Sequence, residues 1–118
     1  MTGRERRSRN YLDLVPLRDP GLPWREREPG LVTLTAAHRG LFNRMAQRCF
    51  GRPAASRIDL DRQGSFVWLQ IDGIRPVGEI GVLLEARFGE EAAPLYPRLV
   101  RFIELLREYR FIRWRTNA

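Results

Sequence analysis

Apolar residues recur along the chain in two periods, and the change of period separates a strand-rich part from a helical part. The stretches WRERE and LVTLT, residues 24–28 and 31–35, flank Pro29-Gly30. Proline and glycine suit positions i+1 and i+2 of a type II turn, which predicts a β-hairpin. Ile58 and Leu60 alternate with polar residues in SRIDL, so a third strand is predicted over Ser56–Leu60.

Three helices are predicted after this strand. The first spans Arg62–Ile71, begins after Asp61 as N-cap, and ends at Asp72-Gly73, since glycine accepts the left-handed conformation beyond a helix end. The second spans Val77–Phe88, where apolar residues recur at spacings of three and four. The third spans Ala92–Tyr109.

The third predicted helix has more apolar surface than one packing face requires. A stripe that faces a core covers about 100° of a helix, whereas this helix carries two stripes and one further residue off both. The stripes are Leu95, Leu99, Phe102, Leu106 and Tyr109, and Tyr96, Val100 and Ile103; the residue off both is Leu105. Either the helix is enclosed or one flank serves a partner.

The remaining segments are expected to be peripheral. Residues 1–10 are polar and basic, which predicts a disordered terminus. Tyr11–Leu17 suits an edge strand or an extended arm on the core, because apolar residues flank Pro16. Phe111–Trp114 suits a closing extended segment, and residues 115–118 form a tail. We therefore predict one domain over residues 11–114.

An additional helix is predicted between the hairpin and the third strand. LFNRMAQRCF, residues 41–50, has apolar residues at helical spacing opposite polar and basic ones, followed by Gly51 and Pro53 as stop signals. We interpret residues 37–55 as an inserted amphipathic helix that covers the core. The alternative is a basic membrane-surface or partner-facing module.

Together these elements predict an α+β fold, in which a small three-stranded antiparallel sheet precedes a three-helix bundle in a winged-helix-like arrangement with an amphipathic helical insert. The chain carries +7 net charge over 118 residues, and all 21 basic residues are arginine. A winged-helix nucleic-acid-binding protein is therefore an alternative. A recognition helix, however, exposes polar side chains toward base edges, whereas the third helix carries mainly apolar ones.

The residues that catalysis or metal binding requires are sparse. His38 is the only histidine and Cys49 the only cysteine, so this chain does not supply a histidine–cysteine zinc site. The acidic pairs Asp59/Asp61 and Glu90/Glu91 have structural explanations at helix starts. We expect no catalytic residue, no metal and no cofactor. No stretch is long and apolar enough to span a membrane, and we expect a cytoplasmic location.

Residues 64–80 carry a resemblance to a known protein family. The pattern GSFVW, then IDG, then RPVGEI resembles the PqqD family of small proteins in peptide-modification pathways. The likeness covers about Tyr11–Ile112. It implies three strands followed by three helices, also called the precursor-peptide recognition element. It further implies a non-enzymatic chaperone that binds the leader of a ribosomally made precursor peptide and presents it to a radical SAM or other modifying enzyme.

The resemblance also implies where the leader binds: as an added strand beside the third strand, against the third helix. Strand addition takes affinity from main-chain hydrogen bonds and selectivity from side-chain pockets. Mapped onto this sequence, the peptide-binding residues are Arg57, Ile58, Asp59, Leu95, Arg98, Leu99, Phe102 and Leu106. Arg57 and either Arg98 or Arg101 would pair with acidic leader residues. The apolar flank of the third helix can instead pack under the insert or the Trp114 tail.

The chain departs from the family pattern at two places. Pro76 stands where the family usually has a threonine that caps the second helix, and both the N-terminal arm and the 37–55 insert exceed a minimal member. These departures favour a divergent member in an unassigned peptide pathway over a role in making pyrroloquinoline quinone specifically. An exposed sheet edge can also pair with a second copy, so a homodimer is a further alternative.

Overall fold

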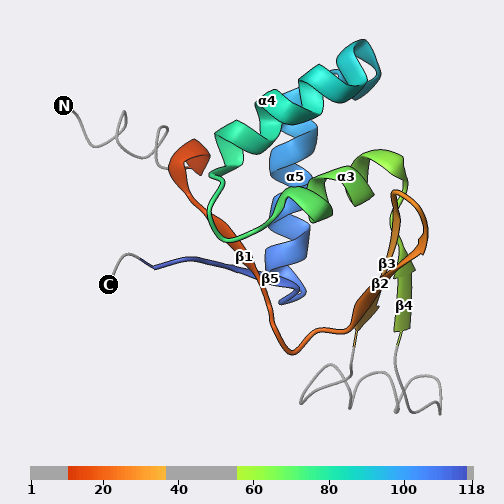
Figure 1. Cartoon of the computed structure of the whole chain (residues 1–118). Coiled ribbons are helices and arrows are strands. Elements are labelled where there is room, and N and C mark those ends of the chain that lie inside the picture. The colour runs from red at the N-terminus through yellow and green to blue at the C-terminus, as the bar shows by residue number, and fades with distance from the viewer. Residues whose placement is uncertain (1–10, 37–55, 117–118) are drawn as a thin grey trace.

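The computed structural model describes residues 11–36 and 56–116. In these residues a three-stranded antiparallel sheet, ordered β2-β3-β4, precedes three α-helices, as Figure 1 shows. The strands are β2 (Trp24–Glu28), β3 (Leu31–Ala36) and β4 (Ser56–Asp59), and the helices are α3 (Arg62–Gln70), α4 (Val77–Phe88) and α5 (Leu95–Glu108). The predicted α+β class is confirmed. The predictions for residues 1–10, for the 37–55 insert with His38 and Cys49, and for the last two residues lie outside the described ranges.

The β2–β3 hairpin forms as its turn residues predict. Gly30 has φ +79°, a conformation that glycine adopts at no steric cost, and it follows Pro29 in the turn. A register shift between Glu26 and Glu28 adjusts the pairing next to the turn. Strand β4 then pairs with β3, with Leu34 opposite Ile58 and Thr35 opposite Arg57.

Helix α3 is tied to the sheet at its first turn. The Asp61 side chain accepts a hydrogen bond from the Gly64 amide at 2.8 Å, which confirms the predicted N-cap. Ser65 is fully buried, and its hydroxyl accepts from the Val32 amide at 2.8 Å and donates to the Leu60 carbonyl at 3.2 Å. One side chain of α3 therefore joins β3 to the end of β4.

Helix α4 has the predicted bounds. It begins after Pro76, which takes the N-cap position without a side-chain hydrogen bond, and ends at Gly89 with φ +57°. Between α3 and α4, the Asp72 side chain accepts hydrogen bonds from the amides of Ile74 and Arg75, both at 2.9 Å. These bonds hold the pKa of Asp72 below its ordinary value and fix the turn that leads into α4.

Helix α5 is shorter than predicted. Its start is at Leu95 rather than Ala92, because residues 89–92 form a separate 3-10 turn, η1 (Gly89–Ala92), and Pro94 follows before the helix. The proline restricts the residue before it to extended conformations, and Ala93 has ψ 143°. The acidic pair Glu90 and Glu91 therefore lies in η1 and does not open α5.

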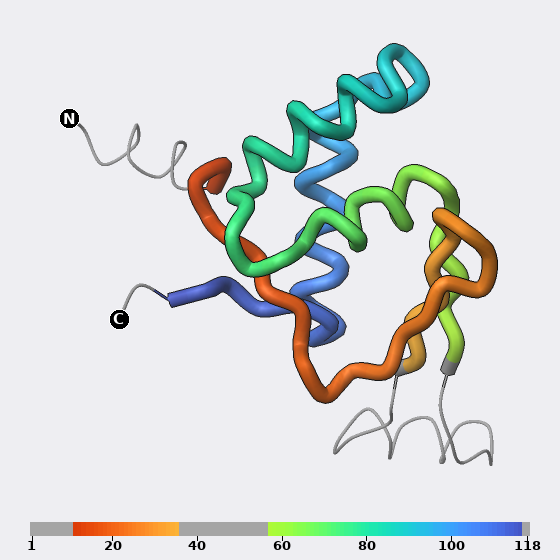
Figure 2. The backbone as a smooth tube through the Cα atoms, viewed as in Figure 1, coloured from red at the N-terminus to blue at the C-terminus, as the bar shows by residue number. Residues whose placement is uncertain are grey.

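The two ends of the described chain pair with each other. Strand β1 (Pro16–Arg18) and strand β5 (Ile112–Trp114) form a second, two-stranded antiparallel sheet, and Figure 2 shows these two segments running side by side. The closing extended segment is thus confirmed at Ile112–Trp114. The interpretation of Tyr11–Leu17 as a single extended stretch is wrong in part, since residues 11–13 are helical and the strand starts only at Pro16.

The core lies between the three-stranded sheet and the helices. Its fully buried side chains come mainly from β3 and the three helices or the residue that ends α3, with Trp68 the largest of them. The others include Val32, Leu34, Ile71, Val77, Ile80 and Ile103. Trp24 of β2 meets Trp68 edge to face, with ring centroids 6.0 Å apart, so the hairpin is packed onto α3 through aromatic contact.

Candidate functional site

The outer edge of β4 is unpaired among the described residues, because β3 is its only neighbour in the sheet. The Leu60 amide donates to the Val32 carbonyl at 2.9 Å, which makes this pair hydrogen-bonded. Hydrogen-bonded and non-hydrogen-bonded pairs alternate along an antiparallel ladder. The main chain of Ile58, two residues before Leu60, therefore bonds to Leu34 of β3. The amide and carbonyl groups of Arg57 and Asp59 consequently point to the open edge.

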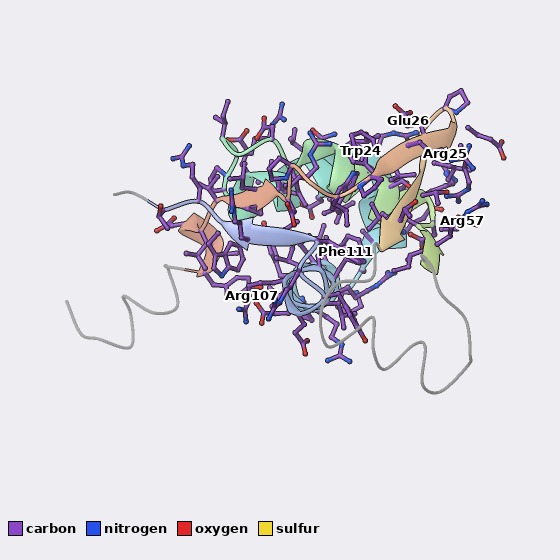
Figure 3. The ribbon with its side chains drawn as sticks, turned by 90° about the horizontal axis from the view of Figure 1, so that it is seen from below. Trp24, Arg25, Glu26, Arg57, Arg107 and Phe111 are labelled. Atoms are coloured by element: carbon purple, nitrogen blue, oxygen red, sulfur yellow. The ribbon has the colours of Figure 1, made fainter. Side chains whose placement is uncertain are left out.

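The side chains of β4 divide between the two faces of the sheet. Ile58 lies on the face that carries the buried Leu34, yet it remains 36% exposed because it is at the edge. Arg57 and Asp59 lie on the opposite face. Figure 3 shows Arg57 on the outer side of the sheet, together with Arg25 of β2. The three predicted binding residues of this strand therefore do not share one surface.

The outer face of the sheet contains an engaged acid, Asp59, and two arginines, Arg25 and Arg57, that form no ion pair with another described residue. The Thr33 hydroxyl donates to the Asp59 carboxylate at 2.8 Å, and Arg27 approaches the same carboxylate oxygen at 3.8 Å. Arg27 also donates to the Leu60 carbonyl at 2.8 Å, which bridges from β2 to the end of β4. Arg57 is exposed and forms no ion pair with another described residue.

On α5 the predicted residues separate into core and flank. Leu99 and Leu106 are 2% and 3% exposed and belong to the core cluster. Leu95 and Phe102 are half-buried and pack at its border. The Phe102 ring lies against Gly64, where an added Cβ would be 3.3 Å from the ring. This contact places the Phe102 flank of α5 beside the start of α3 and hence beside the end of β4.

Arg98 lies at the rim of this flank. It is exposed, and its guanidinium donates to the Glu91 carbonyl at 3.3 Å. Gln63 of α3 donates to the same carbonyl at 3.1 Å. The first turn of α3 therefore lies beside Arg98 and η1, at one end of the surface between β4 and the Phe102 flank of α5.

Two residues outside the predicted set belong to the same flank. Leu105 and Tyr109 follow Phe102 at spacings of three and four residues, which places them on one side of the helix. Leu105 is half-buried and Tyr109 is 58% exposed. The spacing of Arg98, Phe102, Leu105 and Tyr109 is visible in the sequence. Because Leu99 and Leu106 are predicted as peptide-binding residues, these four residues are not predicted to form one surface.

The opposite flank of α5 is covered by the N-terminal segment. The Tyr11 hydroxyl donates to the Glu104 carboxylate at 2.8 Å, and its ring meets Trp114 edge to face at 5.7 Å. Tyr96, at the far end of this flank, lies against Gly81 of α4. The surplus apolar surface of α5 is thus used on this side, and only the Phe102 flank faces the open sheet edge.

Glu104 is held ionised by its neighbours. Hydrogen bonds from Arg107 and then Tyr11 keep the pKa of Glu104 below its ordinary value of 4.5, and burial raises the pKa of Tyr11. A carboxyl group whose pKa is lower in the folded state stabilises the fold above its unfolded-state pKa. This contribution is lost as the pH falls through the folded-state pKa.

Tyr11→Phe is therefore expected to lower the free energy of unfolding in a pH-dependent way. The loss should be about 1 kcal/mol at about pH 7, and it should be smaller in more acidic solution, at a pH below the lowered folded-state pKa of Glu104, because the protonated carboxyl group is a weaker acceptor. Urea denaturation at the two pH values measures the difference. Tyr109→Phe, at an exposed tyrosine of the same helix, should show neither effect. An equal loss at both pH values would contradict a role for the hydrogen bond.

Two properties of the described part of the chain bear on other functions. In residues 11–36 and 56–116, no group of three or more His, Cys, Asp or Glu side chains is arranged to hold a metal ion. None of the helices in these ranges is long and apolar enough to cross a membrane.

Comparison with known proteins gives one match. No curated protein and no solved structure shows significant similarity to the chain. A family model described as coenzyme PQQ synthesis protein D (PqqD) matches residues 53–112, just over half of the chain. The matched region begins three residues before β4 and ends at the first residue of β5, so it contains the open edge and the whole of α5. The chain is a member of the PqqD family.

Proposed function

We propose that this protein is a non-catalytic chaperone that binds the leader segment of a ribosomally made precursor peptide and presents it to a modifying enzyme of the radical SAM type. Membership of the PqqD family supports a role in the synthesis of such peptides. The observation that carries the proposal is the open edge of β4, where the main-chain groups of Arg57 and Asp59 have no partner strand among the described residues.

The leader binds as a fourth strand along β4. Its main chain pairs with Arg57 and Asp59, while alternate side chains fall on the two faces of the extended sheet. Those on the inner face meet Ile58 and the flank of α5 formed by Leu95, Phe102, Leu105 and Tyr109. Those on the outer face meet Arg57, which favours an acidic residue there. The buried Leu99 and Leu106 support this flank from beneath.

Replacement of Arg57 by proline tests this binding mode. Proline removes an amide that points to the open edge, a position that edge strands tolerate, and it also removes the guanidinium. Binding of the precursor leader encoded beside this gene should weaken at least about fivefold, since one main-chain hydrogen bond alone contributes about 1 kcal/mol. Fluorescence anisotropy with a labelled leader measures the affinity.

The matched control is Arg57→Ala, which keeps the amide and removes the guanidinium. If the main chain and the side chain both contribute, the alanine variant weakens binding less than the proline variant does. The effect of the alanine variant should be smaller still with a less acidic leader. If the protein binds DNA, and its affinity for both the leader and DNA falls steeply as the salt concentration rises, nucleic-acid binding is favoured instead. Equal affinities of the wild-type and proline variants would overturn strand addition at β4.

A further inference from the structure

A second candidate site lies at the C-terminal end of α5, where the helix turns into β5. A solvent-open cavity of about 360 Å³ is bounded there by residues of α5, β5 and the segments next to them. Figure 1 shows where the end of α5 and β5 lie in the fold. Its walls carry three arginines, one acid and two apolar residues. They are Arg107, Arg110 and Arg113, Asp19, and Ile112 and Trp114.

The arginines differ in what they contact. Arg107 is paired with Glu104 through a hydrogen bond of 3.0 Å to its carboxylate. Arg110 and Arg113 are exposed, and their guanidinium groups form no ion pair or hydrogen bond with another described residue. Asp19 accepts from the Gly21 amide at 2.9 Å. Glu104 balances the charge of Arg107, and Arg110 and Arg113 still leave an excess of positive charge over Asp19 in the cavity, which favours an anionic ligand.

The local backbone brings the two arginines into one cavity. Arg110 has φ +65°, a left-handed conformation that is uncommon for a residue with a side chain. Its amide donates to the Arg107 carbonyl at 3.0 Å, and the Phe111 amide donates to the Leu106 carbonyl at 2.8 Å. These bonds end α5 and redirect the chain into β5. Arg110 and Arg113, on either side of this redirection, both reach the cavity.

The apolar part of the walls favours a carboxylate side chain over a phosphate chain. The guanidinium of arginine presents parallel donors that match two oxygens of either group. The half-buried Trp114 offers an apolar surface for the short hydrocarbon stem of an aspartate or glutamate.

The cavity and the β4 edge lie on different sides of α5. Arg107 falls on the flank that Tyr11 and Glu104 occupy, opposite the Phe102 flank, and Figure 3 shows Arg107 on the side of α5 away from the three-stranded sheet. A ligand in the cavity therefore leaves the sheet edge accessible. Both surfaces can be occupied at once.

We infer that this arginine cavity binds acidic side chains of the modifying enzyme. The inference rests on the proposed function, because a protein that presents a peptide needs a separate surface for the enzyme that receives it. The enzyme residues are identified by their chemistry, as neighbouring aspartates or glutamates on an exposed surface.

The test uses a double variant, Arg110→Asn with Arg113→Gln, in the full-length chain. Asparagine is chosen at residue 110 because it tolerates the left-handed conformation. The control, Arg25→Gln with Arg87→Gln, removes the same charge from two other exposed arginines. Thermal melting should show both variants folded, since all four side chains are exposed.

The first measurement is an NMR titration with the dipeptide acetyl-Glu-Glu-amide, followed by one with inorganic phosphate. The dipeptide should shift the signals of the Trp114 indole and the Arg113 amide at lower concentration than phosphate does. The double variant should require about tenfold more dipeptide, because it loses two charge-assisted contacts, and the control should change less than about twofold. Tighter binding of phosphate, or equal binding by both variants, would overturn the inference.

The second measurement is the affinity for the modifying enzyme encoded beside this gene. The double variant should bind it about tenfold more weakly than the control does, and the double variant should bind the leader peptide like wild type. Arg57→Pro should show the reverse pattern. If the leader fails to bind wild type while the enzyme still depends on Arg110 and Arg113, the proposed function fails and the cavity assignment stands. If the double variant binds the enzyme as tightly as wild type does, the assignment of the cavity to the enzyme is wrong.

Discussion

Replacement of Trp68 by alanine is expected to destabilise the domain by about 3–5 kcal/mol, the largest effect of any single substitution considered. Trp68 is fully buried at the centre of α3, and Trp24 packs on its ring. Alanine leaves a cavity that β2, α3 and the core side chains around it cannot close without moving. Because domains of this size are stable by only about 5–15 kcal/mol, urea denaturation should show a large loss of free energy of unfolding.

Trp68→Phe is the matched control. It keeps an aromatic ring for the contact with Trp24 and removes the indole N–H, which is buried without a hydrogen-bond partner among the described residues. Loss of an unpaired buried donor offsets part of the lost volume, so the cost should stay below about 2 kcal/mol. A phenylalanine variant as unstable as the alanine variant would show that the indole N–H has a partner after all.

The second large effect is expected at Ser65. Ser65→Ala removes the acceptor of the Val32 amide, which lies in a fully buried residue of the central strand. A buried N–H without an acceptor costs about 1–3 kcal/mol. Beyond its effect on stability, the change loosens the connection between α3 and the sheet, since the same hydroxyl also bonds the Leu60 carbonyl.

Hydrogen exchange gives a specific measure of this change. The Val32 amide should lose protection in Ser65→Ala by more than the amides of α4, which the serine does not contact. Ser65→Cys, with a similar volume and a weak sulfur acceptor, should fall between the alanine variant and wild type. Uniform loss of protection in all elements would mean that Ser65 acts only through global stability.

Those elements whose signals are local could be predicted from the sequence. Helix α4 has the predicted bounds because its apolar spacing is regular and Gly89 ends it at positive φ. The β2–β3 hairpin follows from Pro29-Gly30, and α3 begins where Asp61 caps it. In each case one or two residues determine the backbone conformation without reference to distant parts of the chain.

Elements that depend on distant contacts could not be predicted in the same way. Strands β1 and β5 have three residues each, and their partners are almost a hundred positions apart in the sequence, so nothing local identifies the pairing. The division of α5 into a core face and an open flank could not be predicted for a related reason. Because α5 is apolar on more than one side, its sequence does not show that Leu99 and Leu106 face the core and that Leu105 and Tyr109 join Phe102 on the flank.

The pairing of β1 with β5 has a consequence for how the domain can be combined with other proteins. It brings Tyr11 and Trp114 into contact, so both ends of the described chain leave at one place, far from the edge of β4 (Figure 1). Adjacent ends allow a domain to be inserted in a loop of a larger protein or fused at either side. Fusion of this domain to an enzyme, at either end, should therefore leave the edge of β4 exposed.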